Sequence, residues 1–254
     1  MIKHILTWLG LTGYLFVMLA FVGKEQENIL CRQIRIHIND SMEVGFVTSD
    51  QIMKIINPDP ATLLGKPVRT INISDLEDKL HKIRSIRTAE VYYTVEGHLS
   101  VDINQRRPLV RIIDDSGASY CIDTEGYLIP MTGQYIPYIL IANGNIRAID
   151  GKVSHIIDLE NHKMLEDIYR LSKYLIEDAF LQAQIVQVYV NSNKEFELIP
   201  RVGSHVILLG DMNEFETRLN NLKTLYDQGF SSVGWNQFEK INLKYKNQVV
   251  CTKR

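Results

Sequence analysis

Paired acidic side chains come closest to a catalytic pattern in this chain. One pair is Asp114 with Asp115, and the other is Asp123 with Glu125. Two neighbouring carboxyl groups can divide the roles of general acid and general base. Each pair lies beside glycine or serine, however, where aspartate is favoured because its side chain accepts hydrogen bonds within a turn. We therefore predict turns at both places and no catalytic pair.

Metal and phosphate chemistry also lack a recognisable motif. The seven histidines are dispersed, and His155 and His162 have no third ligand at a spacing typical of zinc sites. The stretch Gly65-Lys66-Pro67 lacks the upstream glycine and the following hydroxyl residue of a phosphate-binding loop. The sequence predicts no cofactor, no metal and no small-molecule substrate, and hence a protein that is not an enzyme.

Three cysteines are too few and too scattered for a disulfide scaffold or a zinc site. They are Cys31, Cys121 and Cys251. Two interpretations stay open. Either Cys121 and Cys251 form a disulfide in an oxidising compartment, or all three are free, as buried cysteines often are.

Composition indicates a folded protein that does not bind nucleic acid. The 254 residues are 45% hydrophobic and 23% charged, a proportion that can bury a core. The 28 basic and 30 acidic residues give a net charge of −2, without the excess of basic residues that nucleic-acid binding requires. The length after the first hydrophobic segment suggests two small domains.

The first hydrophobic segment spans residues 5–23 and contains no charged residue. Its sequence is ILTWLGLTGYLFVMLAFVG. Its length is close to the ~20 apolar residues that a helix needs to cross a membrane. A cleaved signal peptide is the alternative, but its apolar core is shorter and ends in a small-x-small site that this segment lacks. We expect one transmembrane helix, with Ile5, Trp8 and Val22 among its anchoring residues.

The flanks of this helix set its expected orientation. Residues 1–4 would form a cytoplasmic stub, because the larger part of the chain is the part that must be translocated. Residues 24–32 are polar and acidic and read as a juxtamembrane spacer.

Hydrophobic periodicity predicts a small α+β domain over residues 33–107. Isoleucines alternate with polar residues over 34–38, as in a strand with one buried face. Thr48-Ser49-Asp50 can cap one helix and Ser74 a second. A hairpin follows over 89–103, with its turn at Glu96-Gly97. The order strand, helix, helix, strand, strand predicts a three-stranded sheet with both helices on one face.

Residues 108–254 read as a second, strand-rich mixed domain with two packed helices. The expected helices lie over 161–178 and 215–228. The expected strands lie over 110–112, 120–122, 128–130, 138–141, 185–190, 195–199 and 205–209. Strict alternation predicts one last strand over 241–251. Such a strand at a sheet edge can accept a strand from another chain.

The chain resembles the bacterial cell-division family FtsQ/DivIB, especially its Bacteroidetes forms. The resemblance covers essentially the whole chain and is most specific in Gln105-Arg106-Arg107-Pro108 and in the YCIDTEGYLIPM stretch. The matching stretches are 46–50, 76–80, 89–112, 120–131 and 241–250. It implies a POTRA domain in the first folded part and a β domain in the second.

The resemblance further implies a non-enzymatic scaffold of the division machinery in the bacterial inner membrane. Its N-terminus would be cytoplasmic, its bulk periplasmic, and its place the division septum, where it links early and late division proteins and regulates septal peptidoglycan synthesis. Its partners would be FtsB-like and FtsL-like proteins, bound through the β domain. Carried over by position, the partner-binding residues are Lys244, Tyr245, Asn247, Gln248 and Val249.

Arg106 and Arg107 have two open interpretations, as a charged surface for partners or as a solvated hinge between the domains. Pro108 biases Arg107 toward an extended backbone, which suits a stiff junction. Two alternative functions for the whole chain rank below the scaffold. A membrane-tethered sensor or ligand-binding protein would need a cytoplasmic output module, for which the expected four-residue stub is too short. A wall-metabolism enzyme would need a catalytic constellation, and the sequence shows no recognisable one.

Overall fold

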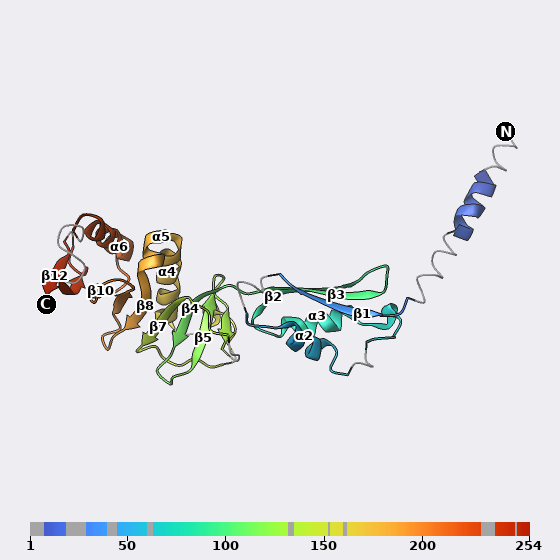
Figure 1. Ribbon diagram of the computed structural model, residues 1–254, viewed down its shortest axis with the longest axis horizontal. Helices are drawn as coiled ribbons and strands as arrows, with labels where there is room; N and C mark the ends of the chain where they lie inside the picture. Colours follow the sequence, from blue (N-terminus) through green and yellow to red (C-terminus); the bar gives the residue numbers. More distant parts are fainter. Residues whose placement is uncertain are drawn as a thin grey trace. The chain divides into compact units, whose positions relative to one another are not determined.

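The computed structural model describes residues 8–18, 29–39, 45–59, 63–131, 135–151, 153–159, 162–229, 237–246 and 248–254. The chain divides into two compact units, Met1–Gln105 and Arg106–Arg254. Figure 1 shows the elements of each unit in chain order.

Residues 8–18 form a helix whose side chains are exposed, Trp8 among them. In the part of the chain that the structure describes, no helix combines the length and the apolar character needed to span a membrane. The helix expected over 5–23 extends beyond the described residues, and both Ile5 and Val22 lie outside them. The transmembrane helix therefore stays a prediction.

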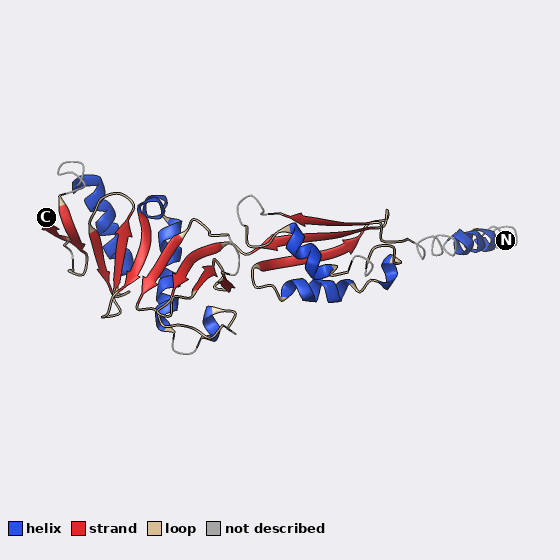
Figure 2. Cartoon of the chain, turned by 60° about the horizontal axis from the view of Figure 1, so that its bottom comes forward, coloured by secondary structure: helices blue, strands red, loops and turns tan. Residues whose placement is uncertain are grey.

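The first unit has the predicted three-stranded sheet with two helices. Its elements are β1 (Gln33–Ile38), α2 (Ser49–Ile56), the short 3-10 helix η2 (Val68–Thr70), α3 (Ile73–His81), β2 (Ile86–Tyr93) and β3 (His98–Gln105). β3 lies in the middle, parallel to β1 and antiparallel to β2. Figure 2 shows both α-helices on one face of this sheet, where Ile52 and Leu80 are fully buried. The α+β prediction for this unit is confirmed.

The helix caps agree with the sequence in one case and differ in the other. Thr48 Oγ1 accepts a hydrogen bond from the Gln51 amide at 3.3 Å, and Gln51 Oε1 accepts one from the Thr48 amide at 3.0 Å. This capping box begins α2 as predicted. Ser74 does not cap α3, because the helix begins earlier and Asn72 Oδ1 accepts the amide of Asp75 at 3.2 Å. Asparagine caps as well as serine does, so residue type alone did not distinguish the two.

The second unit is built on a mixed sheet, which has nine strands within the described residues. Its strands are β4 (Pro108–Ile113), β5 (Ser119–Asp123), β6 (Leu128–Pro130), β7 (Leu140–Gly144), β8 (Ile185–Val190), β9 (Phe196–Pro200), β10 (Val206–Gly210), β11 (Phe238–Asn242) and β12 (Val250–Lys253). The strand order is β12-β11-β10-β9-β8-β7-β4-β5-β6. β7 is parallel to both of its neighbours, whereas β8–β9 and β9–β10 are antiparallel.

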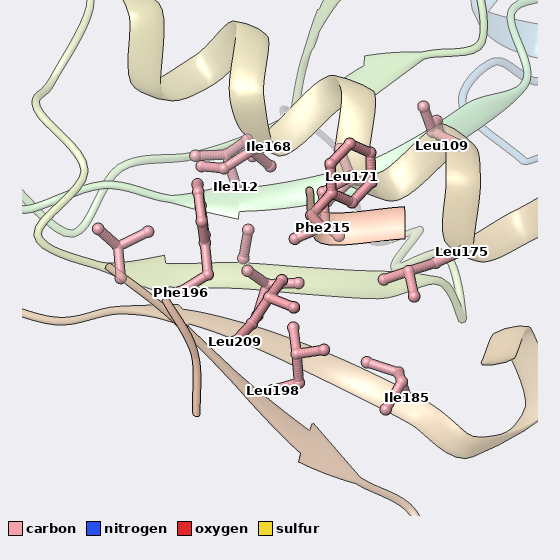
Figure 3. Close-up of a cluster of buried hydrophobic side chains, with 14 of the residues drawn as sticks. Leu109, Ile112, Ile168, Leu171, Leu175, Ile185, Phe196, Leu198, Leu209 and Phe215 are labelled. Carbon is pink, nitrogen blue, oxygen red and sulfur yellow. The ribbon is translucent and has the colours of Figure 1, made fainter. Parts of the chain in front are cut away.

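Helices α4 (Lys163–Glu177), α5 (Ala179–Gln184) and α6 (Phe215–Thr224) lie on the same side of this sheet (Figure 1). Figure 3 shows Ile168 and Leu171 of α4 beside buried side chains of the strands, including Ile112 and Phe196. The strand-rich fold with packed helices is thus confirmed. Helix α5 was not predicted from the sequence, because six residues are too few to show a helical period.

Asp178 ends α4 and begins α5. Its carboxylate accepts the amides of Phe180 and Leu181, both at 3.0 Å, and pairs with Lys223 at the end of α6. The hydrogen bond from Lys223 and those from the two amides lower the pKa of Asp178. One side chain therefore caps one helix and ties it to another.

We predict that the stabilisation from this pair disappears in acid. Because the folded-state pKa of Asp178 is lowered, the contribution is complete above the unfolded-state pKa of about 4 and is lost as the pH falls through the folded-state value. Asp178→Asn keeps an oxygen for the cap and removes the charge. Urea unfolding should show wild type more stable than this variant at pH 7, with the gap closing below about pH 4. Glu177→Gln, which removes the charge of an exposed neighbour, is the matched control and should unfold like wild type at pH 7.

The sheet order excludes the proposed disulfide. Cys121 lies on β5 and Cys251 on β12, and both are free thiols. The strand order separates these two strands by seven interstrand spacings, a distance on the order of 30 Å. A disulfide needs Cα atoms within about 7 Å. Burial raises the pKa of the Cys121 thiol to about 12, which keeps it protonated and unreactive.

Candidate partner-binding site

The end of the chain forms a hairpin of two short strands. The prediction of one continuous strand over 241–251 is wrong, because β11 ends at Asn242 and β12 begins at Val250. β11 lies parallel to β10, and β12 returns antiparallel to β11 with Ile241 opposite Cys251. The described members of the predicted partner-binding set, Lys244, Tyr245, Gln248 and Val249, therefore all lie in the connection between the strands. This connection, residues 243–249, is called the terminal turn below.

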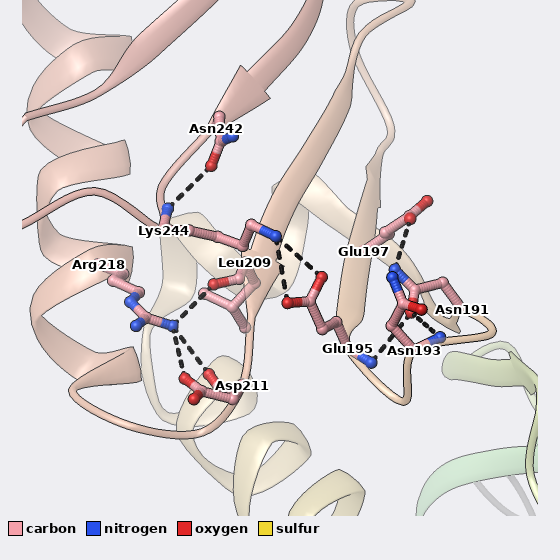
Figure 4. Close-up of polar contacts among 9 residues, drawn as sticks. All are labelled: Asn191, Asn193, Glu195, Glu197, Leu209, Asp211, Arg218, Asn242 and Lys244. Atoms are coloured by element: carbon pink, nitrogen blue, oxygen red, sulfur yellow. Dashed lines mark hydrogen bonds and ion pairs between the residues drawn. The ribbon is translucent and has the colours of Figure 1, made fainter.

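The side chain of Asn242 explains where β11 ends. Its Oδ1 accepts a hydrogen bond from the amide of Lys244 at 3.0 Å (Figure 4). An asparagine that bonds the backbone two residues on replaces the strand ladder by a turn. Leu243 still donates its amide to the Leu208 carbonyl at 3.0 Å and is buried. The alternation of apolar and polar residues continues beyond the end of β11 because Leu243, which lies outside the strand, is still buried in the core.

Lys244 holds the terminal turn against the hairpin of β8 and β9. Its Nζ lies 3.1 Å and 3.0 Å from the two carboxylate oxygens of Glu195, and Figure 4 shows the lysine reaching across to this residue. Both side chains are partly exposed, so solvent weakens the pair to at most about 1 kcal/mol. The contact thus positions the turn more than it stabilises the fold.

Gly210 makes room for the Lys244 side chain. Its φ of +86° lies in the left-handed region, and an added Cβ would lie 2.9 Å from both Cγ and Cδ of Lys244. Such distances are shorter than carbon atoms tolerate. The left-handed backbone angle therefore favours glycine at this position, and the missing Cβ leaves room for the lysine side chain that crosses it.

Arg218 and Asp211 form a second ion pair beside Gly210. Arg218 Nη1 donates to the Leu209 carbonyl at 2.9 Å and to both the carbonyl and Oδ1 of Asp211 at 3.0 Å (Figure 4). Burial raises the pKa of Asp211, but hydrogen bonds from Arg218 and Asn213 outweigh it and lower the pKa overall. The carboxylate is therefore charged at neutral pH. Two ion pairs thus flank the start of the terminal turn.

The terminal turn presents an exposed aromatic ring. Tyr245 is 51% exposed, and Gln248 is exposed as well, whereas Val249 packs partly against the core. Asn247 lies outside the described residues. An aromatic side chain on a braced turn supplies contact area at a low entropic cost. The partner-binding role of these residues stays a prediction.

β12 ends the sheet and offers an unpaired strand edge. Among the strands described it has one neighbour, β11. Arg254 fixes its end, because its amide donates to the Gln237 carbonyl at 3.2 Å and its guanidinium bonds Ser204. The exposed Val250 and Lys253 lie along this strand. A fixed edge of this kind can pair with an added strand.

Arg106 forms its ion pairs and its aromatic contact with residues of the second unit. Its Nη1 lies 3.0 Å from Asp123 and 3.3 Å from Glu125. Its guanidinium carbon lies 3.6 Å from the centroid of the Tyr127 ring. Arg107 is exposed, and its carbonyl accepts the amide of Thr124. Nothing in the sequence distinguishes Arg106 from Arg107, but in the structure Arg106 is partly buried and Arg107 is exposed.

The paired carboxylates lie in turns, as predicted. Asp114 Oδ1 accepts hydrogen bonds from the amides of Ser116 and Ala118, each at 3.0 Å. Asp123 Oδ1 accepts those of Glu125 at 2.9 Å and Tyr127 at 2.7 Å.

His155 has both ring nitrogens in hydrogen bonds to the backbone, at Glu125 and Ile157. Over the described ranges of the chain, no group of three or more His, Cys, Asp or Glu side chains could hold a metal ion.

Four residues of the site were not predicted from the sequence: Glu195, Gly210, Asp211 and Arg218. Glu195 lies 49 positions before Lys244 in the chain, and the sheet order brings the two together. No local pattern marks such a pair. The Gly210-Asp211 dipeptide is a turn signal at the end of a strand, but it does not indicate a site.

Comparisons with known proteins found a separate match for each of two parts of the chain. Residues 107–252, more than half of the chain, match the family described as FtsQ/DivIB, C-terminal related. Residues 29–104 match a POTRA-like domain. A search of curated proteins found no match.

Proposed function

The chain belongs to the family of FtsQ/DivIB C-terminal-related proteins, and on this premise we propose that it is a scaffold of the bacterial division machinery. The family is typically non-enzymatic. A POTRA-like domain precedes the family's domain in this chain. The proposed role is to link early and late division proteins and to regulate septal peptidoglycan synthesis through binding.

One observation carries the partner-binding part of the proposal. The braced terminal turn, with Tyr245 exposed, lies directly before β12, whose outer edge has no neighbouring strand among those described. An extended segment of a partner could pair with β12 through backbone hydrogen bonds, which supply affinity. Tyr245 would add an aromatic anchor of the type that dominates many interfaces.

The proposed partners are FtsB-like and FtsL-like proteins. Lys244, Gln248 and Asn247 would contribute polar contacts at the start of the added strand, and Val249 an apolar one. Arg107 remains a candidate for a separate partner surface, since it is exposed.

The proposal includes a membrane tether over residues 5–23. This segment carries no charged residue, and we propose that it holds the two folded units on the periplasmic side of the inner membrane at the septum. Residues 1–4 would be cytoplasmic.

Replacing Tyr245 by alanine should weaken binding of an FtsB-like partner at least about tenfold, because an aromatic anchor contributes more than about 1.4 kcal/mol. The measurement is a titration of the full chain in detergent with the purified partner. Tyr93→Ala is the matched control, since Tyr93 is 47% exposed on the first unit. Equal affinity of wild type and Tyr245→Ala would remove the terminal turn from the interface.

Depletion of the chain in its own bacterium tests the function as a whole. We expect filamentous cells and a septal position for a tagged copy, and we expect Tyr245→Ala to restore division poorly. Normal division after depletion would refute the scaffold role, whatever the binding titration shows.

A further inference from the structure

An apolar groove of about 520 Å³ lies in the second unit, apart from the terminal turn. It is bounded by the end of α4, by α5, by the first residues of β7 and β8, and by the segment that leads into β7. Its volume falls in the range of about 300–1,000 Å³ that is typical of ligand pockets.

The floor of the groove is hydrophobic and so is its rim. Leu109, Leu175 and Ile185 are buried at the floor, and Figure 3 shows the three along one side of the core, with Leu175 between the other two. At the rim, Ile136, Tyr138 and Ile176 are 64%, 86% and 42% exposed. Single exposed apolar residues are ordinary, but several gathered around one groove mark an interaction surface.

Two arginines give the groove a positive charge. Arg111 and Arg201 line it, and its lining includes no aspartate or glutamate. Arg111 Nε donates to Ser119 Oγ at 2.8 Å, and the Arg201 guanidinium carbon lies 5.4 Å from the centroid of the Tyr138 ring. In the portion of the chain described, neither arginine forms an ion pair. A complementary occupant therefore combines an apolar group with negative charge.

We propose that this groove binds an acidic, apolar segment of a partner protein. A large apolar side chain of the segment enters the groove above Leu175 and Ile185, and carboxylates beside it pair with Arg111 and Arg201. The exposed rim favours a protein segment over a small amphiphile, because a small molecule would leave Ile136 and Tyr138 in water. Tyrosine and arginine are also the residue types enriched at the centres of protein interfaces.

This surface is independent of the proposed strand-binding edge. β8 is separated from β12 by four interstrand spacings in the sheet, or about 19 Å. A segment in the groove would leave β12 free to pair. The second unit would then bind two partner segments at once, and the failure of one surface would leave the other intact.

The test uses a phage-displayed library of random 12-residue peptides against the full chain in detergent. Selection should enrich peptides with a large apolar residue beside Asp or Glu. Fluorescence polarisation should then show at least tenfold weaker binding to Arg201→Glu and to Ile176→Glu. Arg147→Glu and Ile157→Glu are matched controls, because both residues are exposed outside the groove, and they should bind like wild type.

Several outcomes would overturn the proposal. One is a selection that enriches no peptides, or only neutral or basic ones. Another is binding that Arg201→Glu and Ile176→Glu leave unchanged while both melt like wild type. Displacement of a selected peptide only by unlabelled chain, with dimers in light scattering, would assign the groove to a second copy. Saturable binding of dodecanoate without any selected peptide would assign it to a small amphiphile.

Discussion

Replacing Gly144 by alanine should destabilise the second unit by about 2–4 kcal/mol. Gly144 ends β7 with a φ of +101°, and an added Cβ would lie 2.3 Å from the Val190 carbonyl oxygen of β8. That oxygen already accepts the amide of Asn145 at 2.9 Å, so it is not free to move aside. The substitution therefore combines left-handed backbone strain with a clash in the middle of the sheet.

Two other glycines separate these effects. Gly117 has a φ of +84° but no atom within 4 Å of an added Cβ, so Gly117→Ala should cost only the strain, about 1–2 kcal/mol. Gly151 also has open space around it, and its φ lies outside the left-handed region, so Gly151→Ala should be nearly neutral. Hydrogen exchange during urea unfolding of the full chain reports each unit separately. Equal losses for Gly144→Ala and Gly117→Ala would show that β8 yields to the extra atom.

Replacing Arg106 by alanine should cost about 3 kcal/mol, because it leaves the Asp123 carboxylate buried without its cation. The Asp123 side chain is 2% exposed and that of Arg106 is 13% exposed, so solvent cannot replace the lost charge. The packing of the guanidinium on Tyr127 is lost as well. The same exchange measurement should show the loss in the second unit.

Arg147→Ala is the control for charge removal at an exposed site and should change stability by less than about 0.5 kcal/mol. Adding Asp123→Asn to Arg106→Ala should restore part of the stability, because it removes the uncompensated charge and keeps the oxygen that accepts the amides of Glu125 and Tyr127. A loss below about 1 kcal/mol for Arg106→Ala would favour a partner surface at this residue.

The cluster of Arg106, Asp123 and Tyr127 joins the two stretches of sequence that are most specific for the family resemblance. Gln105-Arg106-Arg107-Pro108 and the YCIDTEGYLIPM stretch are the most specific parts of the family resemblance. In the structure they meet, since Arg106 from the first stretch pairs with Asp123 from the second. The contacts of Arg106 account for this residue within the fold, whereas the exposed Arg107 keeps its candidate role at the surface.

Local order could be predicted from the sequence because it depends on near neighbours. Alternation marked β1, β2 and β3, and capping chemistry marked α2. The same logic failed over 241–251, because Asn242 uses its side chain to end the strand while Leu243 still enters the core. Periodicity reports which side chains are buried, and a buried residue in a turn keeps the pattern of a strand.

The amino-acid sequence by itself determined the two folded parts, most of their strands and helices, the turn roles of the paired aspartates and the family resemblance. Only the tertiary structure decided which distant side chains meet. It placed Lys244 against Glu195, separated Cys121 from Cys251, and gathered the groove from α4, α5, β7 and β8. The reason is physical: short-range propensity acts along the chain, whereas ion pairs and grooves depend on the order in which strands pair.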